Sequence, residues 1–334
     1  MTTVLSTSAL SVVYRTQRGN TQALDKVDVQ VDQGEIVGLV GETGCGKTTL
    51  ARAILGTLPK SQAEITGGCI KLEGVDTREL ALTTKATGRR AITVVPQDPY
   101  ASLNPLFRIG TQMADLQKYV APQKPAGWFG SRRRRWDDNA LEMFDTVQLA
   151  GGREILLQYP HQLSGGQRQR VMLAMALLPE PKIIIADEPT AALDASIQAQ
   201  ILGLFRKVAS QQRIGMLFTT HDLGAAWEIC DRVVVMHGGR VIESAPRGSF
   251  FFFPRHPHSR RILATASRLD REHLWTSPKV TSQPMPLSGC QFSPRCPRSS
   301  EMCREVCPAL EDKGSEHRVA CHNPWTDEVA FAYD

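Results

Sequence analysis

One loop of eight residues constrains the fold of this chain more than any other feature. Residues 41–48 read Gly-Glu-Thr-Gly-Cys-Gly-Lys-Thr and fit the pattern GxxxxGK[ST] at every defined position. An apolar run at 35–40 precedes the loop, and residues 47–55 have the periodicity of a helix that ends near Gly56. A strand, a glycine-rich turn and a helix in this order predict a phosphate-binding loop, or P-loop.

The chemistry of this loop suits a nucleoside triphosphate. Its glycines let backbone N–H groups approach the phosphates, and the following helix adds a positive dipole end. Lys47 is expected to reach the β- and γ-phosphates, and the Thr48 hydroxyl is expected to bind Mg²⁺. A chance match is the alternative, and the flanking strand and helix disfavour it. The predicted nucleotide-binding residues here are Gly41, Glu42, Thr43, Gly44, Cys45, Gly46, Lys47, Thr48 and Thr49.

Short apolar strands alternate with helical segments along most of the chain. Two stretches, 4–14 and 24–31, alternate in the manner of strands. Residues 99–180 are mostly helical in pattern, apart from a Pro/Gly-rich interruption at 121–130. Because helices that alternate with wholly apolar strands are typical of a parallel sheet, we expect an α/β fold with a helical insert. The further apolar strands are expected at 91–95, 182–186, 215–220 and 232–237.

The sequence changes character near residue 250. Four phenylalanines stand at 250–253, and beyond Pro278 the chain is rich in Pro, Ser and Cys. Its 334 residues are enough for more than one domain. We expect a nucleotide-binding domain at 1–250, with a helical subdomain at about 98–180, and a small Cys-rich C-terminal extension at 251–334.

A second candidate phosphate site lies at residues 163–167, which read Leu-Ser-Gly-Gly-Gln. A serine followed by paired glycines exposes backbone N–H groups, and such a nest suits phosphate oxygens. Two phosphate-binding elements for one nucleotide indicate a composite site shared between two copies of the domain. At this point the chain resembles the ATP-binding-cassette (ABC) ATPases, whose signature is this sequence. The resemblance implies a P-loop NTPase fold and a contact between the ATP of the partner cassette and Ser164, Gly165, Gly166 and Gln167.

The ends of three apolar strands carry polar residues that fit the same family. Asp187 and Glu188 end the most apolar strand; the resemblance implies that Asp187 holds Mg²⁺ and that Glu188 polarises the attacking water. A carboxylate beside the γ-phosphate is a suitable acceptor for the proton of that water. Gln97 matches the family's Q-loop, within reach of Mg²⁺ or the water, and His221 matches the histidine that contacts the γ-phosphate. Solvated acids at a strand end and a structural histidine are the alternatives.

Two further positions follow from the resemblance alone. Asp194 matches the D-loop, which implies a place at the interface between two cassettes. Tyr14 lies where the family has an aromatic that stacks on adenine, and the alternative is an aromatic of the core. No catalytic position departs from the family pattern, which favours a subunit that hydrolyses ATP.

Three segments narrow the resemblance to one branch. Residues 97–105, Gln-Asp-Pro-Tyr-Ala-Ser-Leu-Asn-Pro, are similar to the QDPxxSLNP run of the oligopeptide/dipeptide/nickel importer ATPases. Residues 254–259 look like the PxHPYT of that branch, with His258 in place of tyrosine. Residues 289–297, together with Cys303 and Cys321, resemble its C-terminal extension. The implied function is ATP hydrolysis that powers the import of peptides or a related small solute.

The branch also implies a set of partners. These are ATP and Mg²⁺, a second cassette that is identical or paralogous, two integral membrane permease subunits and an extracytoplasmic solute-binding protein. The chain has no apolar run of about 20 residues and no signal-peptide pattern, so we expect a cytosolic chain whose membrane association comes through a partner. The resemblance implies that it lies on the cytoplasmic face of the inner membrane as a peripheral protein. A net charge of +5 is too weak to argue for nucleic acid.

Three other functions stay open at this point. An exporter ATPase would carry the same cassette motifs. A soluble ABC ATPase that acts on nucleic acid or ribosomes commonly has two cassettes in one chain, whereas this chain has one. The third alternative is a purely structural iron–sulfur protein, but such a protein would not need the full set of residues for ATP hydrolysis.

Five of the eight cysteines crowd into the last 45 residues. In a reducing cytosol such a cluster indicates a metal site rather than disulfides. The spacings of Cys290, Cys296, Cys303 and Cys321 lack the CxxC pairs usual for zinc, although a Cys₄ zinc site, an iron–sulfur cluster and a set of unrelated thiols are all compatible with them. The family resemblance favours a structural [4Fe–4S] cluster on these four. Cys307 is an extra thiol that could compete as a ligand.

Cys45 of the P-loop carries a separate hypothesis. It stands at the start of a predicted helix and beside Lys47, where the dipole and the positive charge are expected to lower the pKa of a thiol. The alternative is a small residue that the loop tolerates.

The run Arg132-Arg133-Arg134-Arg135, between Trp128 and Trp136, has two interpretations. A run of charge usually marks a solvated face. The other interpretation is contact with anionic lipid headgroups, since the helical insert faces the membrane partner in the family.

Overall fold

The computed structural model describes residues 2–16, 19–77, 91–120, 132–191, 193–266 and 288–326, without the side chains of residues 120 and 132–135. The chain divides into two compact units. The first unit consists of Met1–Ser6, Gln30–Ile36 and Cys69–Phe218. The second unit consists of Thr7–Val29, Val37–Gly68 and Thr219–Asp334. Each unit is described below by itself.

The second unit is built on the strand that leads into the P-loop. All five residues of β3 (Ile36–Val40) are buried, and its residues 37–40 pair in parallel with β9 (Arg232–His237). Strand β10 (Arg240–Pro246) returns antiparallel to β9, and the short β12 (Arg318–Val319) and β11 (Glu311–Asp312) complete the order β3-β9-β10-β12-β11. Continuous apolar runs such as Val37–Val40 and Val233–Val235 favour a parallel pair buried on both faces.

Helices of the second unit begin where the sequence supplies caps and end where it supplies breakers. Helix α1 (Lys47–Leu55) follows the P-loop, and Gly56 ends it in the left-handed conformation with φ 67°. Helix α9 (Leu223–Ile229) begins at Asp222, whose carboxylate accepts hydrogen bonds from two backbone N–H groups of the first turn. The C-terminal segments add α10 (Arg247–Phe252), α11 (Pro257–Ala266), η2 (Ser293–Arg295) and α13 (Glu301–Glu305).

The described residues also form a second sheet, of four strands. Its strands are β1 (Thr3–Thr16), β2 (Gly19–Asp32), β4 (Ala63–Leu72) and β5 (Val75–Asp76), in the order β2-β1-β4-β5. Both predicted strands in this region, 4–14 and 24–31, are confirmed as parts of β1 and β2. Strand β4 was not predicted, because residues 63–72 mix buried and exposed positions without a regular alternation.

The first unit combines parallel strands with the helical cluster. Strand β6 (Ile92–Val95) pairs in parallel with β7 (Ile183–Asp187), and β8 (Gly215–Thr220) lies on the other side of β7. Helix α8 (Ala195–Gln212) begins at Asp194. The parallel pairs β3–β9 and β6–β7 confirm the predicted type of sheet. The antiparallel strands β10 to β12 are an addition that the sequence did not indicate.

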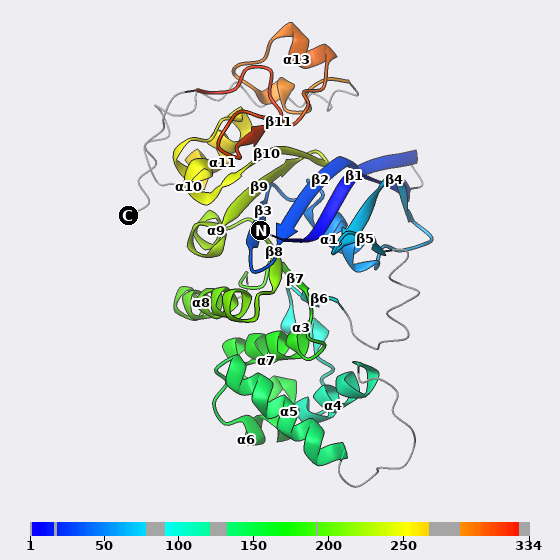
Figure 1. Ribbon diagram of the computed structural model, residues 1–334, viewed down its shortest axis with the longest axis vertical. Coiled ribbons are helices and arrows are strands. Elements are labelled where there is room, and N and C mark those ends of the chain that lie inside the picture. The colour runs from blue at the N-terminus through cyan, green and yellow to red at the C-terminus, as the bar shows by residue number, and fades with distance from the viewer. Residues whose placement is uncertain are drawn as a thin grey trace. The chain divides into compact units, whose positions relative to one another are not determined.

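Five α-helices and one 3₁₀ turn of the first unit pack against one another and form the predicted helical insert (cyan to green in Figure 1). The Pro/Gly-rich interruption predicted at 121–130 lies outside the described residues. Across the described part of the chain, no helix is both long and apolar enough to cross a membrane. The elements of the insert are α3 (Pro99–Ser102), α4 (Ile109–Val120), α5 (Arg132–Thr146), α6 (Gly152–Leu157), η1 (Pro160–Gln162) and α7 (Gly165–Leu177).

Candidate nucleotide site and its surroundings

The P-loop lies in the second unit, between β3 and α1. Its Gly44 and Gly46 have φ angles of 83° and 112°, which favour glycine. A Cβ on Gly46 would lie 2.9 Å from the carbonyl oxygen of Ala23, so no larger residue fits there. Gly46 caps α1 without a side-chain hydrogen bond, and no acidic residue stands in the first turn. The positive end of α1 therefore has no side-chain acceptor at its cap, which suits a phosphate.

Lys47 is 7% exposed and lies over the loop. Its Nζ donates hydrogen bonds to the carbonyl oxygens of Gly41, at 2.6 Å, and Glu42, at 3.4 Å. These carbonyls hold the ammonium group beside the backbone of the loop. Three N–H donors on one ammonium leave room for a phosphate oxygen as an additional acceptor.

The expectation that the pKa of Cys45 is lowered is wrong. Burial raises the pKa of Cys45, and the opposing effect of the Lys47 charge is smaller. The side chain is 5% exposed and packs closely, since a Cβ on Gly41 would lie 2.6 Å from its Sγ. Cys45 is thus the small packing residue of the alternative interpretation.

The signature sequence opens α7 in the first unit. Ser164 is the N-cap: its Oγ accepts from the backbone N–H of Gln167 at 3.2 Å, while Gln167 Oε1 accepts from the N–H of Ser164 at 2.9 Å. This reciprocal pair is a capping box. Gly166 has no room for a side chain, because a Cβ would lie 2.9 Å from Cγ2 of Ile197. The sequence Ser-Gly-Gly-Gln therefore fixes a helix start with its backbone N–H groups close to the surface.

Arg168 ties the signature to the segment after Gln97, and sequence reasoning missed it. The buried guanidinium donates to the carbonyl oxygens of Leu163 and, at 3.3 Å, Pro160. It also lies 3.6 Å from the ring centroid of Tyr100, which stands in the QDPxxSLNP-like run. One feature of the sequence could have indicated the role of Arg168. It follows the signature directly, in the first turn of a helix, where a basic side chain is usually unfavourable.

Gln97 and Glu188 meet in the first unit. The parallel register pairs Val95 of β6 with Ala186 of β7, and each polar residue stands two positions beyond its strand partner. Their side chains are joined by a hydrogen bond from Gln97 Nε2 to Glu188 Oε2 of 3.1 Å. The amide of Gln97 therefore orients one oxygen of the carboxylate.

Glu188 has an unusual backbone conformation. Its φ of 44° lies in the left-handed region, which costs a non-glycine residue about 1–3 kcal/mol. Such strain persists where surrounding structure imposes it, and it is frequent at catalytic residues. The adjacent Asp187 is half-buried at the end of β7.

The other predicted site residues are divided between the two units. Asp194, in the first unit, is exposed and caps α8 by accepting from the N–H of Ile197 at 3.0 Å. Tyr14, half-buried in β1, and His221, exposed after β8, belong to the second unit. The predicted Mg²⁺ ligands come from both units: Thr48 from the second, Gln97 and Asp187 from the first. Their convergence on one ion stays a prediction.

The four predicted cluster ligands lie near one another in the second unit. Burial raises the pKa of Cys296 to about 11 and that of Cys321 to about 12, and in both cases the nearby Cys290 and Cys303 raise it further. The N–H of Cys290 donates to the carbonyl oxygen of Cys303 at 2.7 Å. Asn323 Nδ2 donates to Cys303 Sγ at 3.6 Å. Whether these four thiols hold a metal group stays a prediction.

Cys307 stands at a different place in the same extension. Burial raises its pKa, and the charges of Arg240, Asp25 and Lys26 act on it. Together with Cys290 it lines a cavity of about 380 Å³. Whether it competes as a ligand stays a prediction.

The run Arg132–Arg135 forms the first turn of α5, but its side chains and Trp128 lie outside the described residues.

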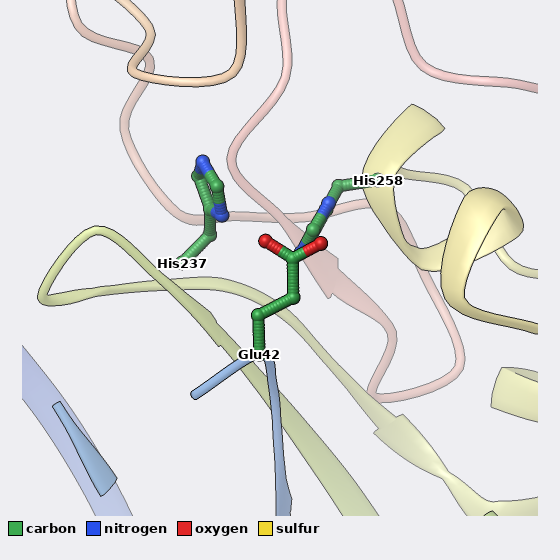
Figure 2. Close-up of side chains that lie close together, drawn as sticks. All are labelled: Glu42, His237 and His258. Carbon is green, nitrogen blue, oxygen red and sulfur yellow. The ribbon is translucent and has the colours of Figure 1, made fainter. Parts of the chain in front are cut away.

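Within the described residues, one group of three metal-ligating side chains has all its ligand atoms within 4.8 Å of one another: Glu42, His237 and His258 (Figure 2). Two arginines face the same group. Arg295 Nη2 lies 3.5 Å from His237 Nε2, and Arg261 Nη2 lies 3.5 Å from His258 Nδ1. Two guanidinium charges at this distance repel a dication, so we do not assign a metal to this group.

Comparisons with known proteins match each part of the chain to a transporter family. Residues 24–191 match the family model described as ABC transporter, and residues 242–303 match the model described as Oligopeptide/dipeptide transporter, C-terminal region. The Dipeptide transport ATP-binding protein DppD of Bacillus subtilis is 37% identical over 326 residues, which cover 96% of this chain and 95% of DppD. The Putative peptide import ATP-binding protein BMEII0863 of Brucella melitensis is 39% identical over 333 residues, covering 95% and 96%.

Solved structures agree with the fold. The dimeric MJ0796, a bacterial ABC transporter cassette, has a TM-score of 0.59 at 27% identity and covers 73% of this chain and 98% of its own. The cbiO1 protein of Clostridium perfringens, part of the ABC transporter complex cbiONQ, has a TM-score of 0.61 at 25% identity, with coverages of 75% and 91%. These matches confirm the predicted α/β fold with a helical subdomain.

Proposed function

We propose that this chain, which belongs to the ATP-binding proteins of ABC transporters, hydrolyses ATP to power the import of peptides or a related small solute. Its C-terminal region is of the oligopeptide/dipeptide type. The observation that carries the proposal is the hydrogen-bonded pair of Gln97 and Glu188 at the ends of two parallel strands. With a complete P-loop in the same chain, this pair supports a subunit that hydrolyses ATP. The names of the two relatives, dipeptide transport for one and peptide import for the other, support the choice of solute class.

The residues of the site have distinct roles in this proposal. Lys47 neutralises the β- and γ-phosphates, and the N–H groups at the start of α1 donate to phosphate oxygens. Glu188 accepts the proton of the attacking water while Gln97 holds the carboxylate in place. His221 contacts the γ-phosphate and Tyr14 stacks on adenine. Thr48, Asp187 and Gln97 would hold Mg²⁺, which supplies charge neutralisation during phosphoryl transfer.

The signature serves the nucleotide of a second cassette. The start of α7 has backbone N–H groups close to the surface, and the similar cassette MJ0796 is dimeric. We therefore infer a head-to-tail pair of cassettes with Asp194 at its interface. The second cassette is identical or a paralogue. Two integral membrane permeases and an extracytoplasmic solute-binding protein complete the transporter, and the chain works at the cytoplasmic face of the inner membrane.

A [4Fe–4S] cluster on Cys290, Cys296, Cys303 and Cys321 is the second part of the proposal. The four cysteines lack the CxxC pairs usual for zinc sites, and the resemblance to the importer branch favours an iron–sulfur cluster on them. The cluster would be structural, and its binding would contribute to the folding of the extension.

The cluster has a direct test. Protein purified without oxygen is expected to contain iron and sulfide and to absorb at about 400 nm, as thiolate-bound clusters do. Cys303→Ser should lose most of this absorbance and Cys307→Ser should retain it. Protein that contains zinc and no iron would contradict this part of the proposal.

The transport function is tested with the assembled transporter in proteoliposomes. Labelled peptide is expected to accumulate when ATP and Mg²⁺ are supplied on the cassette side, and Glu188→Gln should abolish accumulation. Stimulation of the ATPase by RNA or DNA, without any peptide accumulation, would contradict the proposal and support the soluble alternative.

A further inference from the structure

Two arginines of the C-terminal extension hold a residue of the P-loop. Glu42 Oε1 accepts a hydrogen bond from Arg261 Nη2, on α11. The other carboxylate oxygen, Oε2, lies 3.5 Å from Arg295 Nη2, in η2. The residues that meet are 219 and 253 positions apart in the chain, and all three belong to the second unit. Each oxygen of Glu42 thus has its own arginine.

A buried phenylalanine holds both arginines in position. Phe292 is 0% exposed, and the guanidinium carbons of Arg261 and Arg295 lie 5.4 Å and 5.7 Å from its ring centroid. The rings of His237 and His258 pack against the same phenylalanine at 5.6 Å and 4.8 Å. Because this packing restricts the rotamers of the two arginines, less side-chain entropy is lost when they bind Glu42.

The two arginines are half-buried, whereas Glu42 is exposed. Arg261 is 20% exposed, Arg295 32% and Glu42 42%. Partial burial of the arginines reduces the weakening of these ion pairs by water and salt, although the exposed carboxylate limits this effect. Glu42 and His258 approach each other from the P-loop and from α11, as Figure 2 shows.

The P-loop is also held at a second point. The N–H of Gly239, in the turn between β9 and β10, donates to the carbonyl oxygen of Cys45 at 2.9 Å. His237, which contacts Arg295, is the last residue of β9. The loop is therefore fixed at Glu42 by the extension and at Cys45 by the strand turn.

We propose that Arg261 and Arg295 are positioning residues for ATP binding, which they support by holding the carboxylate of Glu42. The charge of Glu42 stands five residues before Lys47, in a loop that must receive the negative phosphates. Two guanidinium groups offset that charge and fix its side chain, and the arrangement as a whole carries one net positive charge. A released carboxylate would repel the phosphates and compete for Lys47. The inference rests on the proposed ATP site in this loop.

The test measures ATP affinity in the full-length chain. A fluorescent ATP analogue is titrated with Mg²⁺ against wild type, Arg261→Gln, Arg295→Gln, Glu42→Gln and the double variant Arg261→Gln/Glu42→Gln. Arg261→Gln is expected to weaken binding about 5- to 20-fold, and Arg295→Gln less, because its contact with Glu42 is longer. In both variants kcat should stay within about twofold of wild type, since neither arginine is assigned to the chemistry.

The double variant separates positioning from a general structural role. It is expected to bind ATP more tightly than Arg261→Gln, because the carboxylate that the arginine restrains is gone. Binding by Arg261→Gln within about twofold of wild type, or a double variant weaker than either single variant, would overturn the inference. If Arg261→Gln does not fold, Arg295→Gln with and without Glu42→Gln provides the same comparison.

Two further variants complete the experiment. Arg304→Ala removes an exposed arginine from α13 of the same extension and should leave ATP affinity unchanged. Lys47→Ala is the reference for the site itself. If Lys47→Ala binds ATP like wild type, the proposed ATP site fails; if it loses binding while the arginine variants do not, only the present inference fails. Melting temperatures of all variants identify those that are unfolded.

Discussion

The starts of helices α1 and α7 are both proposed to bind phosphate, and they are built differently. Helix α7 is capped by its own Ser164 and Gln167, so its first turn is fixed by side chains of the same segment. Helix α1 has Gly46 at its cap and no side-chain hydrogen bond there. Its loop is held by Lys47 from within and by the extension at Glu42. A capping box gives a rigid donor surface, whereas an uncapped start depends on its surroundings.

This difference predicts which changes act locally and which act at a distance. Substitutions at the start of α7 should act on that helix, on the adjacent α8 and on the pairing of cassettes. Substitutions around α1 should alter ATP affinity even when they lie far away in the sequence, as at Arg261. Neither helix start supplies the proton acceptor, so the largest effect on turnover is expected elsewhere.

Replacement of Glu188 by Gln is expected to have the largest effect. Loss of a general base lowers kcat about 10²- to 10⁴-fold, while ATP binding should remain, because both helix starts are intact. Steady-state phosphate release and nucleotide titration measure the two quantities. The matched variant Glu180→Gln changes a carboxylate before β7 and should hydrolyse ATP normally. Turnover of Glu188→Gln within about tenfold of wild type would remove Glu188 from the mechanism.

Lys47→Ala should have the next largest effect, and on affinity rather than on the chemical step alone. Charge-assisted hydrogen bonds contribute about 1.5–3 kcal/mol, which corresponds to roughly 10- to 150-fold weaker ATP binding. Titration of the nucleotide measures this change. Equal ATP affinity in the variant and in wild type would show that the phosphates bind elsewhere.

Ser164→Ala tests the capped helix start. Loss of the N-cap should lower the free energy of unfolding by about 1 kcal/mol and weaken ATP-dependent pairing of cassettes. ATP affinity of a single chain should stay the same. Denaturant unfolding and sedimentation with ATP measure these effects. If Ser164→Ala instead lowers the affinity of the unpaired chain for ATP, the start of α7 acts on the chain's own nucleotide. That result would contradict the difference between the two helix starts.

Gly166→Ala is expected to have a smaller but specific effect. The new Cβ would lie 2.9 Å from Cγ2 of Ile197, so α7 and α8 must shift slightly. The second substitution Ile197→Ala removes Cγ2, so in the double variant the two losses of stability should be less than additive. Additive losses in the double variant would contradict this explanation.

Short-range patterns in the sequence predicted the elements that carry the candidate site. The strand before Gly41, the helix from Lys47 and the polar ends of two apolar strands were all predicted within a few residues. These predictions held because buried parallel strands and helix caps depend mostly on local sequence. The SxxQ capping box was also visible in the sequence, although the serine and glycines were interpreted there only as a nest.

Interactions between distant segments could not be predicted in this way. The pKa of Cys45 was expected to fall because of the helix start and Lys47, and it rises because the folded chain buries the thiol. No pattern links Glu42 to Arg261 or Arg295, since these contacts arise from packing around Phe292. The same holds for Arg168 and Tyr100, which are neighbours only after the helices of the first unit assemble.

The most direct test of the account asks which backbone segments lie next to the γ-phosphate. The assembled transporter is trapped with ATP and vanadate and then irradiated, so that the bound vanadate cleaves the chain beside it. We expect cleavage in two places, within residues 41–48 and within residues 163–167. Cleavage confined to the P-loop would contradict the claim that two differently built helix starts of paired cassettes enclose one nucleotide.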